Sequence, residues 1–212
     1  MMNKFDKTFE KKLEQEIAAI EEKTSVEVVV AITPDSDSYI DAYLKGGILL
    51  SILVLLVLLY SPVSFTETLV LIDMFSALAA GALLVWLFPP VKRLLASSKR
   101  KERYVNRAAN TFFRENELTE TIERTAFLVY ISIFERKCRL IADKGIIDAV
   151  PAAGMQEIEN TFKNLFRGGL PPQRILEVLP TLTQPFSQHL PPAEDNIDEI
   201  SNRLRRTTCR RS

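Results

Sequence analysis

The stretch GGILLSILVLLVLLY, residues 46–60, decides how this chain is organised, because it contains no charged side chain. Extended to residues 44–63 it is about 20 residues long, enough for a helix to cross a hydrocarbon core of roughly 30 Å. A second apolar stretch, LVLIDMFSALAAGALLVWLF, occupies residues 69–88. Paired core helices of a soluble protein usually keep a polar stripe, and these stretches have none. The sequence therefore predicts a transmembrane helical hairpin over residues 44–91.

Asp73 is the one ionisable side chain inside the second stretch. An ionisable residue within a membrane span marks a functional site by default. Asp73 lies about one turn into the predicted helix, where the helix dipole favours an anion, so a structural role is the favoured interpretation. A transport role, or a contact within a homo-oligomer, remains the alternative. Small residues suited to close helix packing follow on the same helix: Ser76, Ala77, Ala80 and Gly81.

Basic residues crowd the exit of the second stretch: Lys92, Arg93, Lys99, Arg100, Lys101 and Arg103. The turn between the two stretches contains no Lys or Arg and one acid, Glu67. By the positive-inside rule, this asymmetry predicts that both termini are cytoplasmic. The basic run is interpreted first as this topology signal, and alternatively as a contact for anionic lipid headgroups.

The whole chain of 212 residues is balanced in charge, with 27 basic and 27 acidic residues. Its basic clusters are juxtamembrane or terminal and carry no interleaved aromatic residues, so nucleic-acid binding is not predicted. The two cysteines, Cys138 and Cys209, have no metal-type spacing and are interpreted as free thiols.

The polar segments on either side of the hairpin are predicted to form one α/β domain, made of residues 1–43 and 92–190. Hydrophobic periodicity and turn residues predict the order α-β-(hairpin)-α-β-β-α-α. The predicted helices are residues 6–23, 100–117, 151–166 and 175–190, and the predicted strands are residues 26–32, 125–133 and 138–143. No single strand can bury its own faces, so the segments before and after the hairpin must share a sheet. Residues 191–212 are polar and are predicted to be a disordered tail.

Several stretches, in this order, make the chain resemble the TPM-domain family, in its bacterial membrane branch with a two-helix insertion. They are VEVVVAI (26–32), DSDSYIDAYL (35–44), FLVYISIFERKCRLIADKGI (127–146) and FSQHLPPAEDNIDEISNRL (186–204). The resemblance implies a three-layer α/β/α sandwich and a bacterial inner-membrane location. Some members of the family are associated with phosphatase activity, divalent metal binding, photosystem maintenance or modulation of receptor channels. This chain enters its strand hairpin with Glu123-RTAF, where asparagine-glycine is common in the family.

Candidate chemistry in the sequence is limited to carboxylates near strand ends. Asp143 and Asp148 follow the predicted strand hairpin, and Asp35 and Asp37 follow the first strand. Carboxylate oxygens suit Ca²⁺ or Mg²⁺, so a metal site is expected if the strand order brings the two pairs together. The single histidine, His189, cannot form a multi-histidine zinc site.

Two functions remain open from the sequence. The first is a non-enzymatic module, anchored in the membrane, that binds a protein partner during assembly or maintenance of a membrane complex. The alternative is a divalent-metal-dependent phosphatase that uses Asp143, Asp148 and Asp35 or Asp37.

Overall fold

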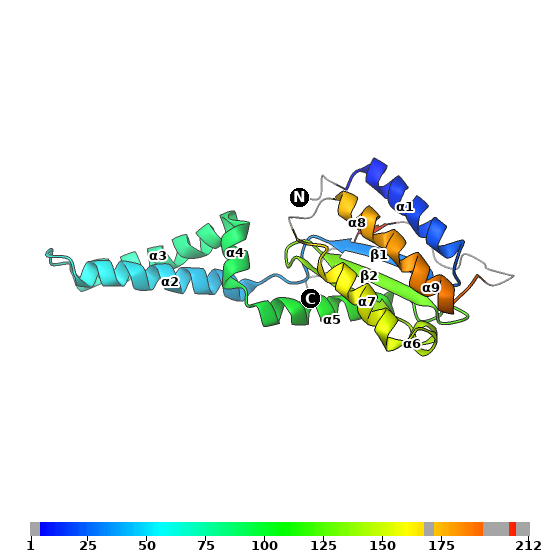
Figure 1. The fold of residues 1–212 in the computed structure, drawn as a ribbon. Coiled ribbons are helices and arrows are strands. Elements are labelled where there is room, and N and C mark those ends of the chain that lie inside the picture. Colours follow the sequence, from blue (N-terminus) through cyan, green and yellow to red (C-terminus); the bar gives the residue numbers. More distant parts are fainter. Residues whose placement is uncertain (1–4, 168–171, 193–203, 207–212) are drawn as a thin grey trace. The chain divides into compact units, whose positions relative to one another are not determined.

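The computed structural model describes residues 5–167, 172–192 and 204–206 (Figure 1). It is a mixed α/β structure that divides into two compact units. The α/β unit comprises Met1–Ser36 and Glu102–Ser212, and the hairpin unit comprises Asp37–Lys101. The α/β unit is thus built from segments that flank the hairpin unit in the sequence.

The sheet of the α/β unit has the strand order β3-β2-β1-β4. β1 (Glu27–Thr33) pairs in parallel with β2 (Ala126–Ser132), and β2 pairs antiparallel with β3 (Lys137–Ala142). β1 precedes the apolar helices in the chain and β2 follows them. The prediction that these two segments share one sheet is therefore confirmed.

β4 (Arg205–Arg206) corrects the prediction of a disordered tail over residues 191–212. It pairs in parallel with Ala31 and Ile32 of β1, and Leu204 packs against the core. β1 is buried on both faces, so an open edge would leave its backbone groups without hydrogen bonds. The polar composition of the tail gave no sign of this pairing. Residues 193–203 and 207–212 of the predicted tail lie outside the described residues.

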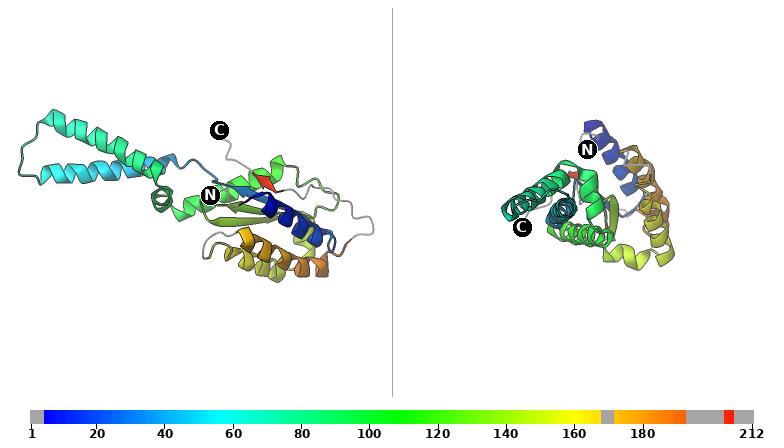
Figure 2. Two further views of the ribbon diagram at one scale, coloured as in Figure 1. Left: turned by 90° about the horizontal axis from the view of Figure 1, so that it is seen from above. Right: turned by 90° about the vertical axis from the view of Figure 1, so that its left-hand side faces the viewer.

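Helices pack on both faces of the sheet (Figures 1 and 2). One face contacts α1 (Lys7–Glu21), α6 (Lys144–Ala149), α7 (Ala152–Lys163), α8 (Pro172–Val178), the 3-10 helix η2 (Leu179–Leu182) and α9 (Thr183–His189). The other face contacts α5 (Ser98–Glu115). Alternate residues of β1 enter the two cores, Val28 and Val30 on one side and Val29 and Ala31 on the other. Its near-continuous apolar run is therefore buried on both faces, as the sequence predicted.

The helices and strands agree with the sequence prediction in type, and the differences have local causes. Asp143 caps the amino end of α6, a short helix that was not predicted; its carboxylate accepts a hydrogen bond from the Lys144 N–H at 2.7 Å. The predicted helix over residues 175–190 is divided by η2, which contains Pro180. Proline has no N–H to donate and disrupts an α-helix at this point.

The hairpin unit contains α2 (Ile40–Leu59), α3 (Glu67–Leu87) and the short α4 (Pro89–Leu95). By length and composition, α2 and α3 are each able to cross a membrane. α2 begins directly after Tyr39, whose backbone is left-handed (φ 52°), and so includes four residues ahead of the predicted membrane span. Most large apolar side chains of these helices are exposed, for example Leu59 (72%) and Phe75 (70%).

Small residues line the contact between α2 and α3. Gly47 and Ser51 of α2 and Ala77 and Gly81 of α3 are buried in this contact. The Ser51 hydroxyl donates to the Met74 carbonyl oxygen at 2.9 Å, across the two helices. Of the four small residues predicted to form a packing face, Ala77 and Gly81 lie in this contact, whereas Ser76 and Ala80 are exposed.

Gly81→Val is expected to force α2 and α3 apart. A Cβ atom on Gly81 would lie 2.5 Å from the Gly46 carbonyl oxygen and 2.8 Å from Gly47 Cα, and these backbone atoms cannot rotate away. We expect a loss of stability of about 1–3 kcal/mol, the usual cost of overpacking. The measurement is the midpoint of thermal unfolding of the full chain in detergent. Ala80→Val, on the exposed side of the same helix, is the matched control and should change the midpoint little; equal shifts would contradict the packing described.

Candidate functional site

A buried group of two hydroxyls and one carboxylate lies at the carboxyl ends of β1 and β2. Ser36 follows β1, Ser132 ends β2, and Glu135 belongs to the turn between β2 and β3. The Ser36 N–H donates to Glu135 Oε1 at 2.8 Å, the Ser36 hydroxyl donates to Ser132 Oγ at 3.0 Å, and the Ser132 hydroxyl donates to Glu135 Oε2. We call these three residues the Ser-Ser-Glu cluster. Carboxyl ends of parallel strands are where open α/β sheets bind ligands, so the cluster is the first candidate site.

The chemistry available to the Ser-Ser-Glu cluster is limited by its surroundings. All three side chains are buried, with Ser132 fully enclosed and Glu135 4% exposed. His189 ends α9 beside Leu190, whose carbonyl oxygen accepts from Ser25 N–H just before β1, at the opposite end of the sheet. His189 is therefore too far away to act as a general base for Ser36 or Ser132. The hydrogen bonds connect the segment after β1 to the β2–β3 turn. The cluster therefore serves to hold these two segments in place.

The predicted metal ligands do not come together. Asp143 follows β3, and its N–H donates to the carbonyl oxygen of Ala126, at the start of β2. Asp35 follows the carboxyl end of β1, which lies at the other end of the sheet. Glu27 pairs with Ala126 and Thr33 with Ser132, so the two ends are separated by the length of the strands, roughly 20 Å. Asp148 is exposed on α6.

The expected meeting of the two carboxylate pairs is therefore wrong. Within residues 5–167, 172–192 and 204–206, no group of three or more His, Cys, Asp or Glu side chains is placed to hold a metal ion. Asp143 instead caps α6.

A second polar group lies inside the hairpin unit, where the chain enters α2. Arg100 Nη1 is 2.8 Å from Asp41 Oδ2, and Arg100 Nη2 is 3.6 Å from Asp37 Oδ2. Lys45 Nζ is 3.2 Å from the same Asp41 oxygen and 3.4 Å from the Leu95 carbonyl oxygen. We call Asp37, Asp41, Lys45 and Arg100 the ion-pair cluster. It joins the start of α2 to the start of α5, and Asp37 is engaged in this pairing.

Lys92 is held by aromatic rings beside the same helix start. Its ammonium lies 5.6 Å from the centroid of Tyr39 and 5.2 Å from that of Tyr43, within the range of a cation–π interaction. Tyr39 is fully buried.

The six predicted membrane-surface basic residues are thus not equivalent. Lys92 and Arg100 contact aromatic or acidic partners, and Lys101 Nζ donates to the Arg93 carbonyl oxygen at 2.8 Å. Lys99 and Arg103 are exposed. Tyr39, Asp41 and Tyr43 were not predicted from the sequence as partners of these basic residues. The spacing of Asp41 and Lys45, four residues apart on one face of α2, was the signal that could have found their ion pair.

Asp73 and Cys138 complete the candidates named from sequence. Asp73 is exposed on the outer side of α3, in its second turn. Cys138 lies in β3 opposite Ile131, and burial raises the pKa of its thiol. A thiol with a raised pKa is neutral at physiological pH, and the thiolate is the reactive form, so Cys138 is not an activated nucleophile.

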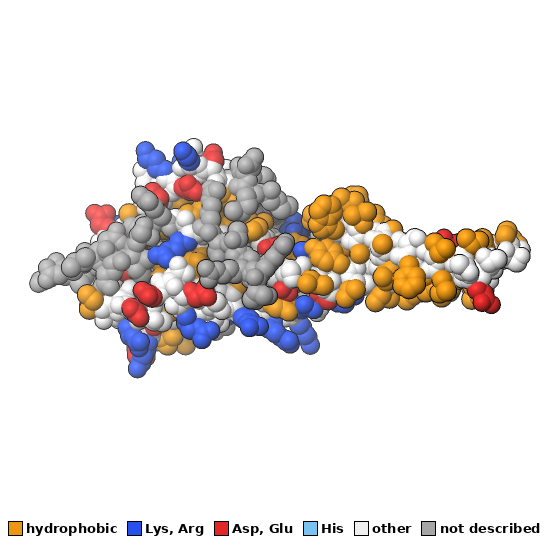
Figure 3. Space-filling view, turned by 180° about the vertical axis from the view of Figure 1, so that it is seen from behind, with side chains coloured by type: hydrophobic (Ala, Val, Ile, Leu, Met, Phe, Trp, Pro, Cys, Tyr) orange, Lys and Arg blue, Asp and Glu red, His pale blue; other side chains and the backbone are white. Residues whose placement is uncertain are grey.

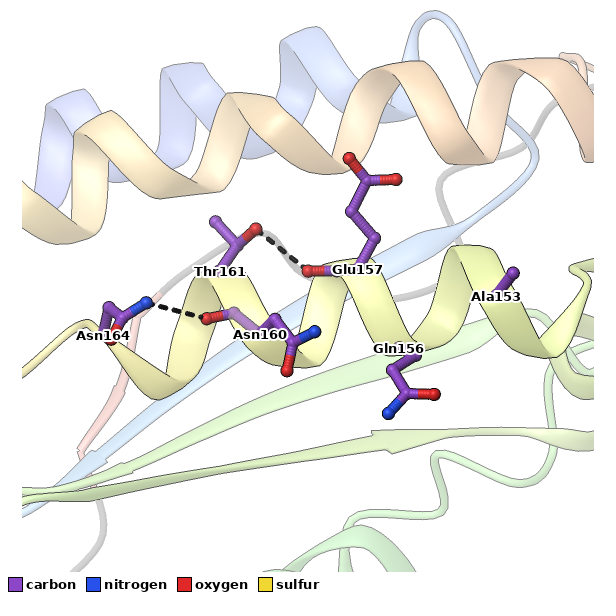
Figure 4. A pocket seen from close by; sticks show the side chains of 6 residues that line it. All are labelled: Ala153, Gln156, Glu157, Asn160, Thr161 and Asn164. Carbon is purple, nitrogen blue, oxygen red and sulfur yellow. Dashed lines mark hydrogen bonds between the residues drawn. The ribbon is translucent and has the colours of Figure 1, made fainter.

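One open hollow of about 500 Å³ lies along α7 (Figure 4). Its lining residues all come from that helix: Ala153, Gln156, Glu157, Asn160, Thr161 and Asn164. Two of these side chains bond to the backbone of their own helix, since the Thr161 hydroxyl donates to the Glu157 carbonyl oxygen and the Asn164 amide donates to that of Asn160. No charged group is buried in the hollow, so it offers a polar surface and not a catalytic centre.

Comparison with known proteins informs the fold alone. No protein-family profile and no curated protein matches this chain. Its structure is similar to the NMR structure of BA42 protein from the psychrophilic bacterium Bizionia argentinensis, with a TM-score of 0.58. The two sequences are 15% identical, and the similarity covers 95% of this chain and 94% of the other.

Arg100→Gln is expected to weaken the junction between α2 and α5. The change leaves Asp37 and Asp41 near each other without their shared cation, and both carboxylates are partly buried. We expect a loss of stability of about 1–2 kcal/mol, measured by thermal unfolding of the full chain in detergent. Lys99→Gln removes the same charge from an exposed neighbouring position and should have little effect. Adding Asp41→Asn to Arg100→Gln should recover part of the loss; strict additivity would show that the pair is not coupled.

Proposed function

We propose that this chain is an integral membrane protein of the bacterial inner membrane, anchored by α2 and α3 with both termini in the cytoplasm. The observation that supports the anchor is the apolar outer surface of the two helices, visible in Figure 3. Only 17% of the apolar window of each helix is buried, whereas a core helix of a soluble protein would be mostly buried. Basic residues follow α3, and the turn between α2 and α3 contains no Lys or Arg. This asymmetry supports the cytoplasmic orientation of the termini.

We infer further that the α/β unit is a three-layer α/β/α sandwich of the TPM type. Helices packed against both faces of the sheet support the layers, and the order of the resembling sequence stretches supports the family. In this arrangement the transmembrane hairpin is an insertion between β1 and α5. Insertions are tolerated at exposed connections because such connections carry few core contacts.

The activity that we propose for the α/β unit is binding of a protein partner in the assembly or maintenance of a membrane complex. Ile122 and Ile147 support it, being 81% and 60% exposed. They belong to adjoining segments, because the Gly145 N–H of α6 donates to the Arg124 carbonyl oxygen at 2.9 Å. Within the described part of the α/β unit, these are the large apolar side chains that are strongly exposed. Two strongly exposed isoleucines on adjoining segments support this surface as the place where the partner binds.

The phosphatase alternative has less support from the described residues. Its carboxylates do not form a metal-binding group, and Asp143 is engaged in capping α6. A phosphomonoesterase assay on the purified full chain, with and without Mg²⁺ or Ca²⁺, separates the two functions. Metal-dependent turnover that Asp143→Asn abolishes would refute the binding-module proposal.

The double variant Ile122→Ser/Ile147→Ser is expected to lose a protein that co-purifies with the full chain from native membranes. Truncation of two apolar anchors at the centre of an interface commonly costs 2 kcal/mol or more, about thirtyfold in affinity. The measurement is quantitative cross-linking and affinity purification. Glu123→Ser/Lys144→Ser changes exposed neighbours on the same two segments and should retain the partner. Retention by both variants would place the binding surface elsewhere.

A cysteine at Ser64, in the turn between α2 and α3, is expected to react with a membrane-impermeant maleimide added to intact cells. Native Cys209 should react only after the cells are opened, because we place the carboxyl-terminal region in the cytoplasm. Gel-shift counting of modified thiols gives the result, with the unsubstituted chain as the control. If Cys209 reacts in intact cells and the cysteine introduced at position 64 does not, the proposed orientation is inverted.

A further inference from the structure

The outer surface of α5 carries arginines that the fold does not use. Arg103, Arg107 and Arg114 recur at helical spacing and lie opposite the buried face of the helix, which contains Val105, Ala109, Phe112 and Phe113. All three arginines are exposed. Across the described residues, none of the three side chains takes part in a hydrogen bond or an ion pair. We call them the α5 arginine row.

The same side of the sheet presents further positive charge. Side chains alternate along β3, so Arg139 shares a face with Lys137 and Ile141, and Ile141 packs with the core under α5. Lys137 pairs with Glu102 of α5 at 3.3 Å, which places that strand end beside the helix. Arg139 is exposed. In Figure 3, Lys and Arg side chains gather along the lower edge of the molecule, where α5 lies.

At the amino-terminal part of the row the charge arrangement opposes the stability of the helix, whereas Arg114 lies in the last turn, where the helix dipole favours a cation. Arg103 and Arg107 are four residues apart, a spacing at which like charges repel. The first turn of α5 contains no acidic residue, although the helix dipole favours negative charge there. Acidic side chains on α5 occur on the flanks, at Glu102 and Glu115, and not between the arginines. Arg103 and Arg107 thus lie where helix stability disfavours them, and none of the three side chains has an acidic partner within the described chain, so the row is suited to an anionic ligand.

The composition of the row indicates the kind of ligand. The remaining residue along the row is Asn110, so this surface has no aromatic or aliphatic anchor of the sort that protein interfaces use. Anionic lipid headgroups, in contrast, attract clustered Lys and Arg through charge alone. α5 begins soon after α3, joined through the short α4. A helix tethered so closely to a membrane span meets a high effective concentration of headgroups.

We propose that the α5 arginine row binds anionic phospholipid headgroups at the cytoplasmic surface of the membrane that holds the hairpin. This inference rests on the membrane anchor proposed above. It moves the lipid contact away from Lys92, Arg100 and Lys101, which have partners inside the hairpin unit, and onto Arg103, Arg107 and Arg114.

The test uses the full chain with Cys209→Ser and Asn110→Cys, labelled with an environment-sensitive fluorophore. The chain is reconstituted in vesicles of phosphatidylcholine alone or of phosphatidylcholine mixed with phosphatidylglycerol. We expect quenching of the probe by acrylamide to fall about twofold in the anionic vesicles and to recover at high salt, where charge attraction is screened. The Cys209→Ser chain without Asn110→Cys measures any labelling of Cys138.

The triple variant Arg103→Gln/Arg107→Gln/Arg114→Gln should abolish this protection of the probe from acrylamide. Lys7→Gln/Lys11→Gln/Lys12→Gln removes the same charge from the exposed side of α1 and should retain it, with a similar circular dichroism spectrum for both variants. Protection that survives the arginine substitutions, or that is equal in uncharged vesicles, overturns the proposal. Protection found only in native membranes and not in pure anionic vesicles also overturns it, in favour of an acidic protein.

Resistance of the reconstituted chain to alkaline carbonate extraction tests the anchor separately. A chain that stays in uncharged vesicles but shows no protection in anionic ones refutes the lipid contact and leaves the anchor in place. A chain that is extracted refutes both.

Discussion

The parallel pairing of β1 with β2 is the constraint on which the rest of this structure depends. These two strands supply the centre of the sheet and the inner residues of both cores, yet the hairpin unit separates them along the chain. The seven paired positions, Glu27 with Ala126 through Thr33 with Ser132, fix where the chain must leave the sheet and where it must return. Parallel strands need a crossover connection, and here the connection contains two apolar helices and α5.

The polar residues near the strand ends serve this arrangement. The Ser-Ser-Glu cluster fastens the departing segment to the β2–β3 turn, and the ion-pair cluster joins the starts of α2 and α5 inside the hairpin unit. Asp143 caps α6 at the opposite end of the sheet from Asp35. Two of the four carboxylates predicted as metal ligands thus have structural roles: Asp143 caps a helix and Asp37 pairs with Arg100.

Periodic apolar patterns made most of the secondary structure predictable from sequence. Phe9, Leu13 and Ile17 mark α1, and the unbroken run in β1 correctly indicated burial on both faces. The chain order also required β1 and β2 to share a sheet. Features that depend on contacts between distant residues were not predictable: the pairing of β4 with β1, and the bond of Ser36 to Glu135. The metal site failed for the same reason, because residue type alone does not place Asp35 and Asp143 at opposite ends of the strands.

The position of β1 ahead of the hairpin affects how the chain folds during synthesis. β1 leaves the ribosome with both faces apolar, and neither β2 nor β4 exists until α2 and α3 have been made. At about 5–20 residues per second, the ribosome needs several seconds to reach β2. During that interval β1 can bury only one face, against α1, and its open edges are free to pair with other nascent chains. Rapid burial of α2 and α3 in a bilayer would hold this unfinished sheet near the membrane while its partner strands are completed.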